Sequence, residues 1–118
     1  MSMRRALNGL RVVDFCWVGA GAIVTKLLAE HGADVIKIES KARLDNLRVA
    51  PPFRPGRNGI EGSGYFASRN NDKRSLALDM RQPRSRELAR DLARVCDLVT
   101  SNFRPGVMER WGLSLIHI

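Results

Sequence analysis

A strand, a helix and a second strand follow one another near the start of the chain, and this order constrains the fold more than any other feature. Arg11–Phe15 is short, apolar and β-branched, which predicts a buried strand. Ala22–His31 predicts a helix with an apolar stripe through Leu27, ended by Gly32, and Val35–Ile38 predicts the next strand. A crossover of this length joins two neighbouring parallel strands.

The same alternation returns in the second half of the chain. Ser75–Asp79 alternates apolar and polar residues as a strand does, and Pro83–Val95 predicts a helix with proline in its first turn. Leu98–Thr100 predicts a further strand, and Val107–Trp111 predicts the opening of another helix. The sequence therefore predicts an α/β fold, namely a Rossmann-like open, mostly parallel sheet with flanking helices.

A segment without periodicity separates the two halves. Residues 40–63 are basic and interrupted by prolines and glycines, which predicts a long loop before ordered structure resumes at Tyr65–Ser68. Loops of this length inside a compact domain are usually functional or mobile. We expect residues 1–113 to form one α/β region with this long loop inside it.

Side-chain patterns add three local expectations. The spacing of Leu88, Leu92 and Val95 predicts the buried stripe of the second long helix. Asp14 lies inside an apolar strand, where we expect it to accept hydrogen bonds from a neighbouring turn rather than to act in catalysis. Lys73 is expected to be exposed at the start of a strand.

Charge and composition narrow the choice of partners. The formal net charge of +8 favours an anionic partner. Basic residues are nevertheless spread along the chain without aromatic–basic motifs, so we expect no nucleic acid partner. No segment approaches the ~20 apolar residues of a membrane span, so we expect no membrane partner and a cytoplasmic protein. Cys16 and Cys96 form no C-x-x-C pair and the histidines lack ligand spacing, so we expect no metal.

The turn after the first strand is similar to part of a dinucleotide site. Val18–Gly21 opens a helix, and Glu39 ends the next strand, where an acid could bind a ribose. Glycines at such a turn let the backbone approach a diphosphate. Val24 occupies the third glycine position, however, so the fingerprint is incomplete. A dinucleotide-dependent oxidoreductase stays a second interpretation, and glycines needed only for a tight turn are the simpler one.

Three motifs follow one another along most of the chain. They are Leu10–Phe15 with Val18–Gly21 and Leu27–Glu39 (LLAEHGADVIKIE), then Asn70–Asp79 (NNDKRSLALD), then Asn102–Arg110 (NFRPGVMER). In this order and at these separations they resemble the family III CoA-transferases, which include formyl-CoA and crotonobetainyl/carnitine CoA-transferases and 2-methylacyl-CoA racemase. The resemblance implies that the chain belongs to an interlocked-dimer CoA-transferase fold.

The resemblance also implies a coenzyme A site at three strand ends. Arginines could supply forked donors to the CoA phosphates, and a phenylalanine could pack against the adenine. Ser40 stands where some relatives carry a phosphate-binding arginine, and Lys41 or Arg43 could take its place. The implied CoA-contacting residues are Gly19, Ala20, Leu78, Asp79, Met80, Arg81, Asn102, Phe103, Arg104 and Arg110.

The known members of this family transfer CoA between an acyl-CoA and a carboxylic acid through an aspartyl intermediate, usually as homodimers. Because they are several times longer and residues 114–118 resemble nothing in them, the resemblance implies that residues 1–113 are the N-terminal part of the CoA-binding domain and that residues 114–118 are a foreign or truncated tail. We therefore expect the nucleophilic aspartate to lie beyond this sequence. None of the aspartates here is nominated as catalytic, and the piece alone is expected to be inactive and poorly stable. An acyl-CoA α-epimerase and a non-catalytic CoA-binding module are the remaining alternatives.

Overall fold

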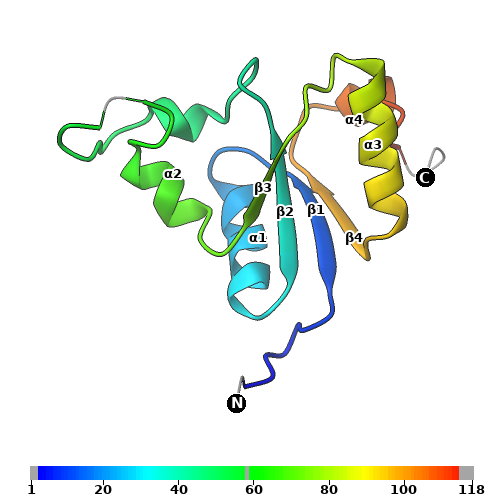
Figure 1. Ribbon diagram of the computed structural model, residues 1–118, viewed down its shortest axis with the longest axis horizontal. Helices are drawn as coiled ribbons and strands as arrows, with labels where there is room; N and C mark the ends of the chain where they lie inside the picture. Colours follow the sequence, from blue (N-terminus) through cyan, green and yellow to red (C-terminus); the bar gives the residue numbers. More distant parts are fainter. Residues whose placement is uncertain (1–2, 58, 115–118) are drawn as a thin grey trace.

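A four-stranded parallel sheet forms the centre of the computed structural model, which describes residues 3–57 and 59–114 (Figure 1). The strand order is β3-β2-β1-β4. β1 (Arg11–Phe15) is central, between β2 (Asp34–Glu39) and β4 (Leu98–Ser101), while β3 (Arg74–Ala77) pairs with the far side of β2. The open parallel sheet predicted from the sequence is confirmed, with strand bounds that shift by one or two residues.

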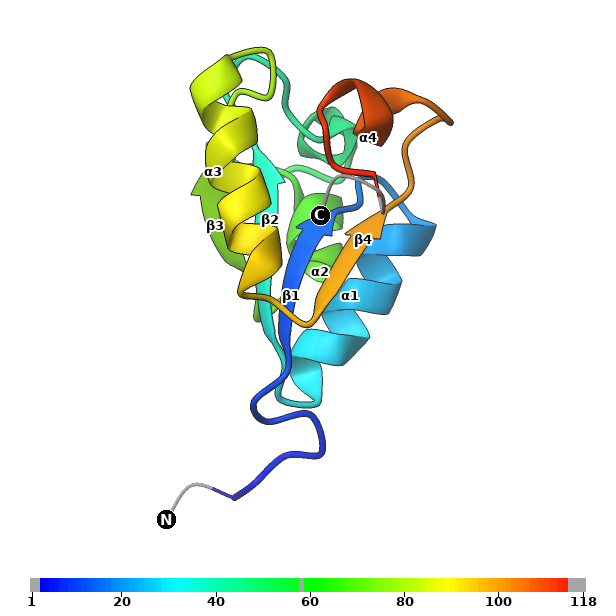
Figure 2. The same ribbon diagram turned by 90° about the vertical axis from the view of Figure 1, so that its right-hand side faces the viewer.

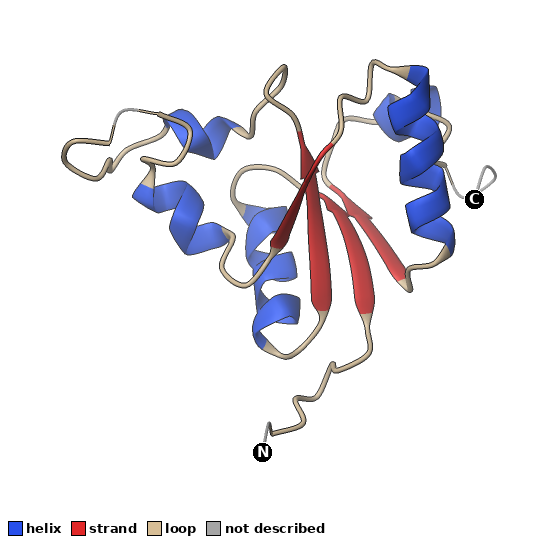
Figure 3. Cartoon of the chain, viewed as in Figure 1, coloured by secondary structure: helices blue, strands red, loops and turns tan. Residues whose placement is uncertain are grey.

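Helices cover both faces of this sheet. Figure 2 shows α1 (Ala20–Glu30) on one side of the sheet and α3 (Pro83–Arg94) on the other. This follows from the topology, because the chain moves outward from β1 to β2 and back across the sheet from β3 to β4. Three shorter helices complete the structure in Figure 3, namely the 3-10 helix η1 (Asn46–Val49), α2 (Gly64–Arg69) and α4 (Val107–Arg110). The segment expected to be one long loop therefore contains η1.

Alternate residues of β1 build the two hydrophobic layers. Val13 and Phe15 pack on the side of α3 with Ile38 and Met80. Val12 packs on the side of α1 with Val35 and alanines of the helix end. All of these side chains are buried, as expected for a parallel strand covered on both faces.

The predicted buried stripe of the second long helix is wrong at two of its three residues, and only Leu92 packs against the core. Leu88 and Val95 are exposed, and the residues that α3 buries are Ala89 and Ala93. α1 behaves in the same way, since Leu27 is exposed while small residues face the sheet. Small side chains let a helix axis approach the sheet closely, so the larger apolar residues stand on the outward side.

Asp14 accepts hydrogen bonds from the turn after β1, from α1 and from β4. Its fully buried carboxylate accepts from the Cys16 N–H at 2.8 Å, from Thr25 Oγ1 at 2.7 Å and from Thr100 Oγ1 at 3.1 Å. Lys73 Nζ lies 3.1 Å from the same carboxylate. The expected role of Asp14 as an acceptor for the adjoining turn is confirmed. The expected exposure of Lys73 is wrong, because its side chain is 2% exposed and reaches inward to this charge.

The buried Asp14–Lys73 pair predicts a large effect of removing either charge. Lys73→Met leaves an uncompensated buried carboxylate, so we expect the free energy of unfolding to fall by about 3 to 5 kcal/mol. Arg74→Ala, which breaks the exposed pair with Asp34, serves as the control and should cost about 1 kcal/mol or less. Urea unfolding measures both. Equal small losses would contradict a structural role for the buried pair.

The buried thiol of Cys16 is expected to react slowly with alkylating reagents. Burial, and next the nearby charge of Asp14, raise the pKa of Cys16 to about 11. Because the folded state holds the proton more tightly than the unfolded state does, the thiolate forms only as the pH approaches that value. We expect iodoacetamide near pH 8 to label the half-buried Cys96 first and Cys16 only after urea is added. Equal labelling rates in the native chain, read by mass spectrometry, would contradict this.

Candidate functional site

The carboxyl ends of the parallel strands meet at one edge of the sheet, and the segments that follow them surround two cavities. The strand ends and arrowheads lie at the top of Figure 1, next to η1 and α4. Open α/β sheets bind ligands outside this edge. The cavity-lining segments are the β1–α1 turn, the start of the loop after β2, residues 78–81 after β3 and residues 102–104 after β4.

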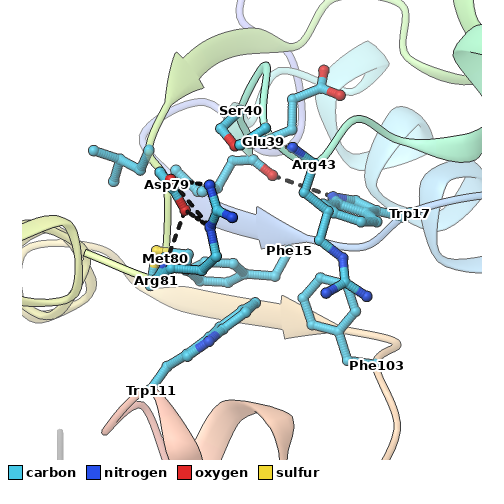
Figure 4. Close-up of a pocket in the computed structure, with 13 residues that line it drawn as sticks. Phe15, Trp17, Glu39, Ser40, Arg43, Asp79, Met80, Arg81, Phe103 and Trp111 are labelled. Atoms are coloured by element: carbon cyan, nitrogen blue, oxygen red, sulfur yellow. Dashed lines mark hydrogen bonds and ion pairs between the residues drawn. The ribbon is translucent and has the colours of Figure 1, made fainter. Parts of the chain in front are cut away.

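The first cavity is a slot of about 230 Å³ with aromatic walls. In Figure 4, Phe15, Trp17, Phe103 and Trp111 surround it, and the side chain of Arg43 reaches across toward Phe103. The remaining lining residues come from the ends of β2 and β3: Ile38, Glu39, Ser40, Ala42, Leu78, Asp79, Met80 and Arg81. The slot suits a flat or extended apolar group.

The aromatic rings of the slot hold one another in place. Trp17 and Phe103 meet edge to face with ring centroids 5.2 Å apart, and Phe103 meets Trp111 in the same way at 5.5 Å. Trp17 Nε1 also donates to the Ile38 carbonyl at 3.3 Å. Edge-to-face pairs of this kind favour one arrangement, so the slot is preorganised by segments far apart in the sequence.

The second cavity is a larger basic groove of about 930 Å³ beside the slot. Trp17, Arg43, Phe103 and Trp111 line both cavities, so the two are continuous. The groove contains four arginines and no acidic residue among its lining residues: Val18, Arg43, Asn46, Arg86, Asn102, Arg104, Val107 and Arg110, besides the shared aromatic rings. Such a groove attracts anions.

Three of the four groove arginines are available to a ligand. Within residues 3–57 and 59–114, the guanidinium groups of Arg43, Arg104 and Arg110 make no hydrogen bond or ion pair, and all three residues are exposed. Arg86 differs, because its Nε donates to the Met80 carbonyl at 2.7 Å and thereby fixes the segment after β3. The three available arginines present forked donors of the type that binds phosphate.

The carboxylates at the slot are each neutralised by an arginine. Glu39 accepts from Arg48 Nε at 3.0 Å and from the Asp45 N–H at 3.0 Å. Asp79 accepts from Arg81 at 2.8 Å, and the hydrogen bonds from Arg81 lower the pKa of Asp79. Neither carboxylate is arranged as a general base or a nucleophile. The slot therefore offers no unpaired carboxylate among the described residues.

The turn between β1 and α1 is clamped from two sides. The Asn102 amide accepts from the Trp17 N–H at 2.9 Å and donates to the Trp17 carbonyl at 2.6 Å. On the other side, Asp45 accepts from the Val18 N–H at 3.1 Å. A Cβ on Gly21 would lie 2.7 Å from the Cys16 Cβ, so only glycine lets the helix start approach this turn.

All but two of the predicted site residues line the two cavities. Leu78, Asp79, Met80 and Arg81 line the slot, Phe103 lines both cavities, and Asn102, Arg104 and Arg110 line the groove. Gly19 and Ala20 line neither, although the adjoining Trp17 and Val18 do. That these residues contact coenzyme A stays a prediction.

Several lining residues did not stand out in the sequence. Trp17 and Trp111 both line the two cavities, although no motif singled out either of them. Arg43 lines both cavities whereas Lys41 lines neither, a choice that the sequence left open. Nothing in the sequence distinguishes Arg86 from the other arginines of α3, so its place in the groove could not be predicted. Tryptophans close to strand ends are the one sequence signal that could have identified this wall.

The described residues contain neither a candidate membrane-spanning helix nor a candidate metal site. No helix of residues 3–57 and 59–114 is long and apolar enough to cross a bilayer. The same residues bring together no group of three or more His, Cys, Asp or Glu side chains that could hold a metal ion.

Curated relatives share sequence along nearly all of this chain. It is 40% identical over 112 residues to the formyl-CoA:oxalate CoA-transferase of Afipia carboxidovorans, a match that covers 95% of this chain and 26% of the relative. A protein of the same name from Rhodopseudomonas palustris is also 40% identical, with 25% of its length covered. The chain thus spans about a quarter of the length of these relatives.

Solved structures share the fold. A CAIB/BAIF family protein from Brucella suis superposes with a TM-score of 0.86 at 37% identity, covering 98% of this chain and 30% of that one. Rv3272 from Mycobacterium tuberculosis superposes with a TM-score of 0.83 at 32% identity, covering 96% and 31%. The sequence model of CoA-transferase family III matches residues 7–117. With the fold, the strand-end cavities and this match in agreement, the chain belongs to CoA-transferase family III.

Proposed function

We propose that this chain forms the coenzyme-A-binding part of an enzyme that transfers CoA from an acyl-CoA to a carboxylic acid. The observation that carries the proposal is the union of an aromatic slot with a basic groove at the strand ends. Coenzyme A requires both, because it joins an adenine and an uncharged pantetheine arm to three phosphate groups. The names of the curated relatives support the same class of reaction.

The charges of the groove match the phosphates. Arg43, Arg104 and Arg110 each offer a guanidinium without an acidic partner among the described residues, and no carboxylate lines the groove. The adjoining slot offers the rings of Trp17 and Phe103 to an apolar or aromatic part of the ligand. Asn102 contributes by holding the turn that carries Trp17. Its side-chain oxygen accepts from the Trp17 N–H, and its side-chain nitrogen donates to the Trp17 carbonyl.

A dinucleotide-dependent oxidoreductase is a weaker interpretation of this site. That function would assign a ribose to Glu39, yet Arg48 and the Asp45 N–H already engage this carboxylate. The helix start at Gly19 lines neither cavity. The arginines that line the groove come from the loop after β2, from α3 and from the segment after β4 instead.

In the proposed reaction an aspartate carboxylate attacks the carbonyl carbon of the donor thioester, the C–S bond breaks, and CoA leaves as a thiolate from an acyl-aspartyl anhydride. The thiolate then attacks the aspartyl carbonyl, which releases the donor acid and leaves an aspartyl-CoA thioester for the acceptor carboxylate. The carboxylates of the slot are held by arginines, so this part of the site binds the cofactor portion and the nucleophile comes from another part of the enzyme. We likewise propose a homodimer. Formyl-CoA and oxalate are the first substrate pair to test, after the names of the relatives.

Coenzyme A binding can be followed by the protein's own fluorescence, because both of its tryptophans line the two cavities. We expect CoA to change this fluorescence with saturation, and Arg104→Ala and Arg110→Ala each to weaken affinity by roughly tenfold or more through the loss of a charged hydrogen bond. Arg94→Ala is the matched control, since it removes an exposed arginine of α3 paired only with Asp91. Equal affinities for all three variants would contradict a phosphate role for the groove.

Catalysis is tested with the complete gene product that contains this sequence. We expect CoA to move from formyl-CoA to oxalate or to another carboxylic acid, followed by mass spectrometry of the CoA esters. Exchange of the α-proton of a branched acyl-CoA in deuterated water, without CoA transfer, would support the epimerase alternative. Binding of NADH without binding of CoA would overturn the proposal.

A further inference from the structure

Asp45 is a fully buried carboxylate outside the two cavities, and all of its polar atoms are used. Its Oδ2 lies 2.9 Å from Lys37 Nζ, and its Oδ1 accepts from the N–H groups of Val18 at 3.1 Å and Leu47 at 3.0 Å. Its own N–H donates to Glu39. A buried charge this fully paired fixes the backbone around it.

These contacts join the two walls of the ligand site. Val18 belongs to the β1–α1 turn, which also carries Trp17, and Lys37 Nζ donates to the Cys16 carbonyl in the same turn at 2.8 Å. On the other wall, Arg43 lies two residues before Asp45, in a short turn closed by the Arg43 N–H donating to the Ser40 carbonyl at 3.1 Å. Asp45 is thus the link between the wall bearing Trp17 and the wall bearing Arg43.

The turn that Asp45 holds is under backbone strain. Val18 has a φ of 63°, a left-handed conformation that a β-branched residue adopts only when its surroundings enforce it. The hydrogen bond from the Val18 N–H to Asp45 and the clamp of Asn102 on Trp17 supply that enforcement. Without Asp45, one side of the turn would be free to relax.

The geometry points to Asp45 as a positioning residue for coenzyme A binding, which fixes Arg43 against the groove and the β1–α1 turn against the slot. This inference rests on the proposed function. Arg43 makes the direct contact, because it is the charged residue without an acidic partner that lines both cavities. Asp45 acts through it and touches no ligand.

A double-mutant cycle tests this inference, with CoA affinity read from tryptophan fluorescence. Arg43→Ala in the native background should weaken affinity by roughly tenfold, because a charged hydrogen bond is lost. In the Asp45→Asn background the same change should weaken CoA affinity by no more than about threefold, because a misplaced Arg43 no longer makes the contact that the change removes. Lys41→Ala, an exposed change on the same loop that lines neither cavity, should leave affinity unchanged.

Val35→Ala controls for loss of stability, since it removes a buried side chain from the apolar layer on the side of α1 and lines neither cavity. It should lower the unfolding midpoint and keep the CoA affinity of the folded fraction. If Asp45→Asn fails to fold, the cycle is run with Lys37→Gln, which keeps a donor toward Asp45 while removing the charge.

The outcomes separate the two claims. If the unaltered protein binds no CoA, the proposed function fails and this inference fails with it. If it binds CoA but Arg43→Ala has no effect, or the two changes are independent of one another, only the positioning role is overturned. A smaller effect of Arg43→Ala in the Asp45→Asn or Lys37→Gln background supports it.

Discussion

The buried carboxylate of Asp14 is the interaction on which the rest of the structure depends. It lies on the central strand and ties that strand to α1 through Thr25, to β4 through Thr100 and to the segment before β3 through Lys73. Each partner comes from a different part of the chain, so the carboxylate fixes how the layers meet. A parallel sheet buried on both faces otherwise offers mainly non-directional apolar contacts, which specify burial better than they specify position.

Buried carboxylates paired with cations also hold the segments around the two cavities. Asp45 with Lys37 and Glu39 with Arg48 fasten the segment after β2 to the sheet, and Arg48 also lies over the ring of Phe66 at 3.7 Å. Replacing such pairs by apolar residues often costs little stability, so their value lies in specifying one arrangement. Here that arrangement places arginines that have no acidic partner among the described residues beside aromatic rings packed edge to face.

Much of the fold could be predicted because the relevant signals are local. The alternation of apolar runs with helical segments located β1, α1, β2, α3 and β4 and required parallel strands. The faces of the helices could not be predicted so well. Apolar spacing placed Leu88 and Val95 inside, whereas Ala89 and Ala93 are buried, since the close approach of a helix to a sheet depends on the sheet. Lys73 was misjudged for a similar reason, because its buried partner lies 59 residues away.

The sequence by itself determined the family, the parallel topology and the strand ends that surround the two cavities, because β-α-β order and short motifs are written along the chain. Tertiary structure alone decided which side chains form the site. It placed Arg43 but not Lys41, and Trp17 and Val18 but not Gly19, in the walls of the cavities, and it made Asp45 the link between the two walls. The physical reason is that cavities and buried ion pairs join residues from different strand ends, and their distances in space are not encoded in their spacing along the sequence.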